Sequence, residues 1–130
     1  MKSFHKADDG AAAVEFALVT PLLLLIILAI ADLGWVFNQQ LTLTAAAREG
    51  ARIMAVHHDD PGASGRAEAR VNELVNSEVT VSFTATCSPA ILDDVATVTV
   101  SAPLDDLTGW LSSIASSTSL TGVGSMRCGG

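Results

Sequence analysis

The chain of 130 residues has few aromatic and few basic side chains. It contains no tyrosine, two tryptophans and four phenylalanines, which favours a membrane segment joined to a modest domain over the thick core of an enzyme. Seven Lys and Arg stand against fourteen Asp and Glu, and the net charge of −7 makes nucleic acid an unexpected partner. The sequence also lacks a recognisable motif around a nucleophilic side chain, and it has no glycine-rich phosphate-binding loop after a strand. We therefore expect no catalytic residue and no cofactor.

What the sequence does have is one long hydrophobic stretch, Gly10 to Phe37, which reads GAAAVEFALVTPLLLLIILAIADLGWVF. Within it, Ala11 to Ala31 has the length of roughly 20 residues that an apolar helix needs to cross a bilayer. The stretch includes one carboxylate near its beginning, Glu15. A charge inside a membrane helix costs roughly 2.5 to 3.5 kcal/mol, so Glu15 is expected to have a partner or a function.

The helix is expected to continue past the membrane to Val56, because Asn38 to Val56 has helix-forming residues and no proline. A helix from Ala11 to Val56 would be about 69 Å long, against ~30 Å of hydrocarbon, so more than half would stand outside. Pro21 is expected to kink it. One face of the outer part carries small and apolar residues at helical spacing: Leu43, Ala46, Ala47, Gly50, Ile53 and Met54.

The remainder, residues 57–130, predicts a small domain. His57 to Gly65 is rich in turn formers, and Arg66 to Asn76 has the spacing of a short amphipathic helix. The apolar face expected for that helix consists of Ala67, Val71, Leu74 and Val75. The fold class expected is α+β: a long N-terminal membrane-spanning helix with a small antiparallel sheet packed on its outer half.

Two strands of that sheet are indicated by alternation of apolar and polar residues, Val79 to Thr86 and Val95 to Ala102. In the second, Ala96, Val98 and Val100 form the apolar phase. The connection of residues 88–94 suits an antiparallel pair joined by a loop. Ser119 to Arg127 is a weaker candidate for a third strand because of its glycines, and residues 103–117 fit either a short helix or an irregular loop.

The junction around Gly10 suggests proteolytic processing. A cut after Gly10 would make Ala11 the new N-terminus and Glu15 the fifth mature residue. The Glu15 carboxylate could then meet the α-amino group of a neighbouring subunit in lipid, which would set the axial stagger of an assembly together with the adjacent Phe16. The alternative is an ordinary anchor in which Glu15 sits at the headgroup level.

Two motifs, Val14-Glu15-Phe16-Ala17 and Ala46-Ala47-Arg48-Glu49-Gly50-Ala51-Arg52, resemble the pattern of the TadE-like family, the minor pilins or pseudopilins of tight-adherence (Flp-type) pili. The resemblance implies that a prepilin peptidase removes residues 1–10 by cutting between Gly10 and Ala11. It also implies a structural role in pilus assembly, with the major Flp-type pilin, a second minor pilin and the inner-membrane assembly platform as partners. In this sequence Asp8 and Asp9 precede Gly10, where many family members have a basic residue.

On this reading residues 1–10 are a leader, 11–37 cross the membrane, 38–56 continue the helix outside and 57–130 form the extracytoplasmic domain. Lys2 and Lys6 favour a cytoplasmic N-terminus in a single-pass protein of the cytoplasmic membrane. Two other interpretations stay open. A signal peptidase could cut after Ala31 and release a soluble domain, or the chain could be a plain anchor that carries a binding module.

Three further groups of residues are candidates for contacts or bonds. Arg48, Glu49 and Arg52 form either a surface for a partner pilin or local helix pairs. Cys87 and Cys128 are expected to form a disulfide that closes a loop of roughly 40 residues, although two free thiols remain an alternative. The segment His57-His58-Asp59-Asp60 has metal-ligand residue types, but we interpret it as a solvated turn and expect no metal.

Overall fold

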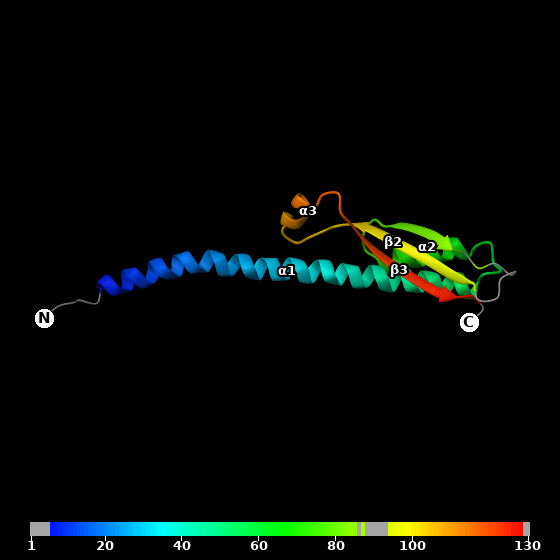
Figure 1. The fold of residues 1–130 in the computed structure, drawn as a ribbon, viewed down its shortest axis with the longest axis horizontal. Coiled ribbons are helices and arrows are strands. Elements are labelled where there is room, and N and C mark those ends of the chain that lie inside the picture. The colour runs from blue at the N-terminus through cyan, green and yellow to red at the C-terminus, as the bar shows by residue number, and fades with distance from the viewer. Residues whose placement is uncertain (1–5, 86, 88–93, 129–130) are drawn as a thin grey trace.

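The computed structural model describes residues 6–85, 87 and 94–128, and its dominant element is one helix, α1 (Lys6–Val56). Its 51 residues correspond to about 76 Å at 1.5 Å per residue. The helix continues through Pro21 and through Ala31. Figure 1 shows a gentle bend in its N-terminal part and all other elements gathered beside its C-terminal half. The expected long helix that extends beyond a membrane-spanning length is confirmed.

Three antiparallel strands form the sheet in the order β1 (Thr80–Ala85), β2 (Val95–Pro103) and β3 (Ser119–Arg127). The first two were predicted from their alternation, and the buried phase of β2 is the predicted one. The third strand, which its glycines had made a weaker candidate, is also present. Residue 86 and most of the predicted loop, residues 88–93, lie outside the described residues. The α+β fold class is therefore confirmed.

The face of the sheet that points to α1 tapers from β1 to β3. Val98 of β2 pairs with Phe83 of β1 on one side and with Gly124 of β3 on the other, so side-chain size falls along this row. In the next row Val100 lies between Val81 and Gly122, so the β3 position is again a glycine. Because β3 presents glycines, it can lie closest to the helix, while the larger side chains of β1 fill the space farther from it.

Gly122 and Gly124 allow a backbone-to-backbone contact between β3 and α1. A Cβ atom added at Gly122 would lie 2.4 Å from the carbonyl carbon of Leu43, and one added at Gly124 would lie 2.4 Å from that of Ala47. Two strand residues advance by about 6.8 Å and four helix residues by about 6 Å, so the two spacings nearly match. The strand therefore follows the helix closely, in the same direction (Figure 1).

The helical side of this interface is the face predicted from its small residues. Of the predicted residues, Ile53 is partly buried and the others are buried: Leu43, Ala46, Ala47, Gly50 and Met54. Ala51 and Ala55, which were not predicted, are buried beside them. Alanine and glycine keep the helix surface low, which is the condition for the close approach of β3. The prediction that the sheet packs on the outer half of the helix is confirmed.

The second helix, α2 (Ala63–Leu74), packs against α1 and completes the core. Ala63, Ala67 and Val71 are buried in it, and Val75 directly after it is buried as well. The sequence prediction was wrong in two respects. The helix begins inside the segment expected to be a turn, and Leu74 is exposed. The buried residues repeat every four positions, and Leu74 falls off that row.

Residues 104–118, here called the α3 lobe, leave the sheet between β2 and β3 and lie beside α1 (Figure 1). The Leu104 N–H donates to the Thr118 carbonyl oxygen at 3.2 Å and closes the base of the lobe. Inside it is a short helix, α3 (Trp110–Ile114), preceded by Gly109 with a φ of +73°, a left-handed conformation that favours glycine. Of the two structures considered for residues 103–117, a short helix is therefore present.

Cys87 and Cys128 form a disulfide, as predicted, with their Cα atoms 5.7 Å apart. The bond joins the end of β1 to the end of β3 across the central strand. The adjacent Cys128 N–H also donates to the Asp94 carbonyl oxygen at 2.9 Å. The disulfide closes a loop of 41 residues, which corresponds to about 4 kcal/mol in the chain-entropy description.

Candidate functional site

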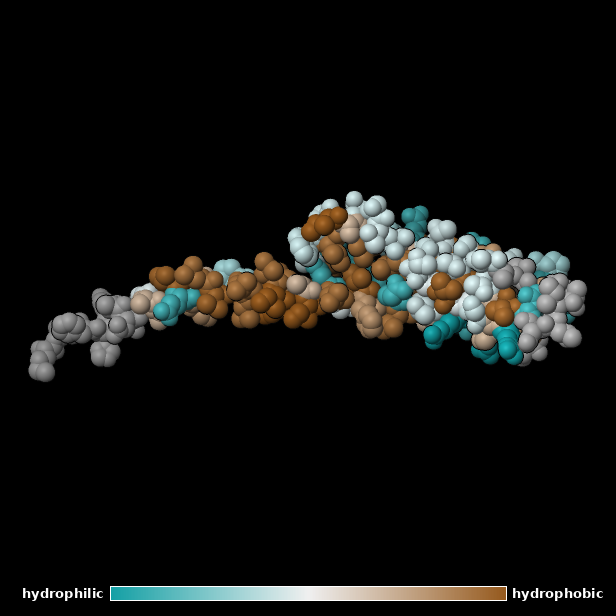
Figure 2. Space-filling view, in the orientation of Figure 1, coloured by the Kyte–Doolittle hydropathy of each residue, from teal (hydrophilic) through white to brown (hydrophobic). Residues whose placement is uncertain are grey.

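The N-terminal half of α1 extends beyond the sheet domain and is strongly hydrophobic from Ala11 onward. Every residue from Gly10 to Ala31 is exposed except Thr20, which is half-buried. Figure 2 shows hydrophobic surface along this half of the helix, while paler and hydrophilic residues gather over the sheet domain. Among the described residues α1 is the one helix long and apolar enough to cross a membrane. Large contiguous apolar surfaces mark sites of contact with a membrane or with other proteins, which makes this surface the leading candidate for a functional surface.

The predicted processing and assembly residues all lie on this bare part of the helix. Gly10 and Ala11 are within α1, and a Cβ atom added at Gly10 would meet nothing within 4 Å. The side chains of Glu15 and Phe16 are exposed, the latter by 73%. Within residues 6–85, 87 and 94–128, the Glu15 carboxylate makes no hydrogen bond or ion pair. Any partner that Glu15 has must therefore come from outside the described part of this chain.

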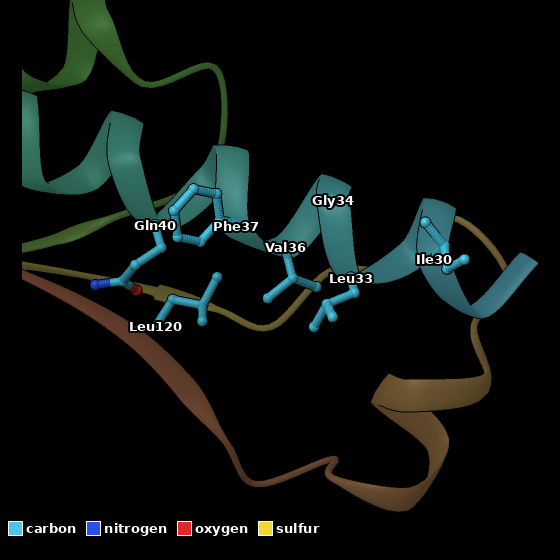
Figure 3. A pocket seen from close by; sticks show the side chains of 7 residues that line it. All are labelled: Ile30, Leu33, Gly34, Val36, Phe37, Gln40 and Leu120. Carbon is cyan, nitrogen blue, oxygen red and sulfur yellow. The ribbon is translucent and has the colours of Figure 1, made fainter.

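A shallow groove of about 580 Å³ lies where the bare part of α1 meets the sheet domain. Its walls are almost entirely apolar, and it is lined by Ile30, Leu33, Gly34, Val36, Phe37, Gln40 and Leu120. Figure 3 shows Leu33 and Val36 pointing from the helix toward the side on which Leu120 of β3 lies. The Gln40 amide donates to the Thr121 carbonyl oxygen at 2.7 Å and fixes the edge of β3 there. At Gly34 an added Cβ would meet nothing within 4 Å, so the helix backbone is accessible.

Asp32 is a buried carboxylate that the sequence analysis did not assign to a contact. It is only 4% exposed, although its neighbours Ala31 and Leu33 are exposed. Its carboxylate accepts two hydrogen bonds from Thr108 of the α3 lobe, one from the backbone N–H at 3.2 Å and one from the hydroxyl. The two residues are 76 positions apart, so no local pattern could reveal the pair. A lone Asp directly after an apolar run was the available signal.

The predicted partner-contact residues on the outer part of α1 are arranged mainly as local helix neighbours. Arg52 and Glu49 approach to 3.9 Å at i,i+3 spacing, which is the alternative considered for them. Arg48 is exposed. An exposed pair at this distance contributes a few tenths of a kcal/mol at most. The arrangement leaves the surface of Arg48, Glu49 and Arg52 available to a partner.

The segment from His57 to Asp60 forms the turn between α1 and α2. The Asp60 carboxylate accepts a hydrogen bond from the Gly62 N–H at 2.7 Å and another from the Arg66 guanidinium at 2.6 Å. These two bonds hold the pKa of Asp60 below its usual value, and the bond from the Gly62 backbone has the larger effect. His57 contacts the Ile53 carbonyl oxygen at 3.2 Å. The side chains here fasten the turn, and no metal-binding group of three His, Cys, Asp or Glu occurs in the described part of the chain.

Residues 10–52 match the family model described as TadE-like protein. No curated protein and no solved structure matches the chain. The matched segment covers the bare half of α1, including Glu15, and most of the face that packs on the sheet. Over residues 10–52, the chain is thus similar to the TadE-like family, as its Val14–Ala17 and Ala46–Arg52 motifs predict.

Proposed function

We propose that this protein is a TadE-like minor pilin with a structural role in the assembly of a tight-adherence pilus. The observation that carries the proposal is the division of α1. From Ala11 to Ala31 the helix is exposed and apolar apart from Glu15 and Thr20, its C-terminal half carries the sheet domain, and the match to the TadE-like family spans both. A long helix of this kind can anchor the subunit in lipid and then pack beside helices of other subunits. This is a non-catalytic role.

Processing by a prepilin peptidase between Gly10 and Ala11 is the first step of this proposal. Residues 1–10 would be the leader, 11–37 the membrane-spanning part, 38–56 the outer part of the helix, and 57–130 the extracytoplasmic domain. The open space around Gly10 means that the fold does not require a glycine there. A requirement for Gly10 in processing would therefore reflect recognition by the peptidase.

Glu15 would act after processing. The new α-amino group of Ala11 on a neighbouring subunit is a cation that can pair with the unpartnered Glu15 carboxylate. Four residues of helix separate the two positions, so pairing in this way sets an axial offset of about 6 Å between adjacent helices. Inside lipid the pair would remove the cost of an isolated charge, which is roughly 2.5 to 3.5 kcal/mol.

The proposed location is the cytoplasmic membrane, with the N-terminus in the cytoplasm and the domain outside. The disulfide supports this orientation, because disulfides persist on the oxidising side of a membrane. The exposed apolar half of α1 would face lipid before assembly and other pilin helices after it. The groove at Gly34 offers a place for such a helix, since small residues let helix backbones approach closely. The prepilin peptidase, the major Flp-type pilin, a second minor pilin and the assembly platform are the proposed partners.

The test is to replace Glu15→Gln in cells that assemble the pilus and to compare it with Glu68→Gln, an exposed carboxylate on α2. We expect Glu15→Gln to leave membrane insertion and processing unchanged and to reduce piliation strongly. Glu68→Gln should pilate normally. Normal piliation in the Glu15 variant would contradict the proposed role of this carboxylate.

A second pair of variants tests processing. Gly10→Leu should leave the protein in its longer, unprocessed form, whereas Gly65→Leu, at another glycine with open space around it, should be processed normally. The readout is the mobility or intact mass of the protein from membranes that contain the native peptidase. If Gly10→Leu is shortened as the wild type is, the cleavage site lies elsewhere.

A further inference from the structure

The α3 lobe carries apolar side chains that the domain leaves uncovered. Leu107, Trp110 and Ile114 are exposed by 59%, 62% and 68%. Trp110 and Ile114 lie four residues apart on one side of α3, and Leu107 lies in the segment that leads into the helix. The other residues from Ser112 to Ser119 are mostly serine and threonine. Figure 2 shows hydrophobic surface on the lobe next to that of α1.

The lobe lies level with the membrane-spanning part of α1. A cleft of about 270 Å³ separates them, and the surface inside it is almost entirely apolar. The residues that line it are Leu25, Leu28, Ala29, Asp32, Thr108 and Trp110. If the apolar run ends at Ala31, then Ala29 lies about 3 Å and Leu25 about 9 Å inside that end. A bilayer that surrounds the run would therefore also surround the side of the lobe that carries Trp110.

The lobe is held at this level by hydrogen bonds. Thr108 is bound to Asp32 of α1, and the Gln39 amide donates to the Asp105 carbonyl oxygen at 2.9 Å. Inside the lobe, the Asp106 carboxylate accepts bonds from the backbone N–H groups of Leu111 and Ser112 at the start of α3. The first contact also shelters the Asp32 carboxylate, which would otherwise be exposed at the border of the hydrocarbon. The position of the lobe is thus a built feature of the fold.

We infer that the α3 lobe is a second membrane contact, which inserts Leu107, Trp110 and Ile114 into the outer interface of the bilayer that α1 crosses. The inference rests on the proposed function in one respect, the insertion of α1. The hydrophobic surface of the lobe continues that of α1, and both tryptophans of the chain, Trp35 and Trp110, lie near the outer end of the run. Tryptophan is typical of this interfacial position. The lobe has no Lys or Arg, so its contact should not depend on anionic lipid.

Depth-dependent quenching of tryptophan emission tests the inference. The full chain is reconstituted into phosphatidylcholine vesicles whose acyl chains carry bromine near the headgroup. Trp35→Phe leaves Trp110 as the reporter of the lobe, and the matched variant Trp110→Phe leaves Trp35 as the reporter of α1. We expect bromolipid to quench Trp110 more than Trp35, because Trp110 lies beside residues deeper in the run. Iodide in the water should quench Trp35 more, and added anionic lipid should change neither result.

Three other outcomes would overturn the inference, and they have different meanings. If iodide quenches Trp110 and bromolipid does not, while Trp35 responds to bromolipid, the lobe stands in water and only this inference fails. If Trp110 is shielded from both quenchers, and only when the protein-to-lipid ratio is high, a second copy of the chain covers the lobe instead of lipid. If bromolipid quenches neither tryptophan, α1 itself is not inserted and the proposed function fails too.

Discussion

The contact between β3 and α1 gives the sharpest prediction about stability. In Gly124→Ala the added Cβ atom would lie 2.4 Å from backbone atoms of Ala47 and Arg48, about 1 Å closer than an ordinary contact. Backbone atoms cannot rotate away, so β3 must move outward and loosen its packing with Val98. Overpacking of this kind costs about 1 to 3 kcal/mol, and a clash with backbone belongs at the upper end.

Hydrogen exchange of the full chain in detergent micelles, read by mass spectrometry on peptides from β2, measures this effect. A loss of about 3 kcal/mol lowers the protection of amides that exchange through opening of the sheet about 100-fold. The bare half of α1 serves as an internal reference, because it makes no contact with β3. Its exchange should be the same in both proteins.

The matched control is Gly65→Ala in α2, where an added Cβ meets nothing within 4 Å. Because alanine is the better helix former by up to about 1 kcal/mol, protection should stay the same or rise by up to about fivefold. The reasoning is refuted if the two variants protect β2 equally, since that would mean that β3 does not approach α1 as closely as Gly122 and Gly124 permit.

Three further predictions concern the bonds that hold the domain together. Asp32→Ala or Thr108→Val should each weaken docking of the α3 lobe by about 1.5 to 3 kcal/mol, and the double variant should cost little more than either, as hydrogen exchange of the lobe can measure. Hydrogen bonds, first from a serine side chain and then from backbone N–H groups, hold the pKa of Asp106 below its usual value. Its ionised form therefore stabilises the lobe above the ordinary carboxyl pKa of about 3.9, and this contribution is lost as the pH falls through the lower, folded pKa; tryptophan emission should report the change. Replacing Cys87 and Cys128 by serine should lower the free energy of unfolding by about 4 kcal/mol, seen as a lower urea midpoint.

Each of these predictions has a result that would contradict it. Fully additive costs in the double variant would mean that Asp32 and Thr108 do not act on each other. An acid transition of the lobe that persists in Asp106→Asn would place the titrating group elsewhere. A urea midpoint that is the same in the serine variant and in the wild type would show that the disulfide does not constrain the unfolded chain.

Patterns that repeat within one element were readable from the sequence. The apolar run and the absence of proline after it predicted α1, and alternation predicted β1 and β2. The small residues on the outer part of α1 predicted where the sheet packs. In each case the signal and the structure it specifies lie in the same short segment, so the local period is sufficient.

Features that depend on a distant partner were harder to predict. The glycines of β3 argued against a strand. They are needed only because the backbone of α1 at Leu43 and Ala47 lies directly against them, and the sequence of β3 alone does not show this contact. Leu74 was placed in the core because α2 was read from its own periodicity, and the direction of its buried face depends on how it packs against α1. The bond between Asp32 and Thr108 joins residues 76 positions apart, and although the lone Asp after the apolar run was a signal, no local pattern identifies Thr108 as its partner.

The proposed assembly residues were identified from spacing and family resemblance alone, and for Glu15 the described residues contain no partner. A contact between subunits, or with a peptidase, leaves no trace in the packing of a single chain. The bare surface of α1 is consistent with such contacts but does not specify them.

The measurement that tests the central claim most directly is the N-terminal sequence, or the intact mass, of the protein from membranes that contain its native prepilin peptidase. The account predicts a chain that begins at Ala11. A chain that begins at Asp32 would indicate a secreted domain released by signal peptidase, and an intact Met1 would indicate a plain membrane anchor. Either of these two results would contradict the account.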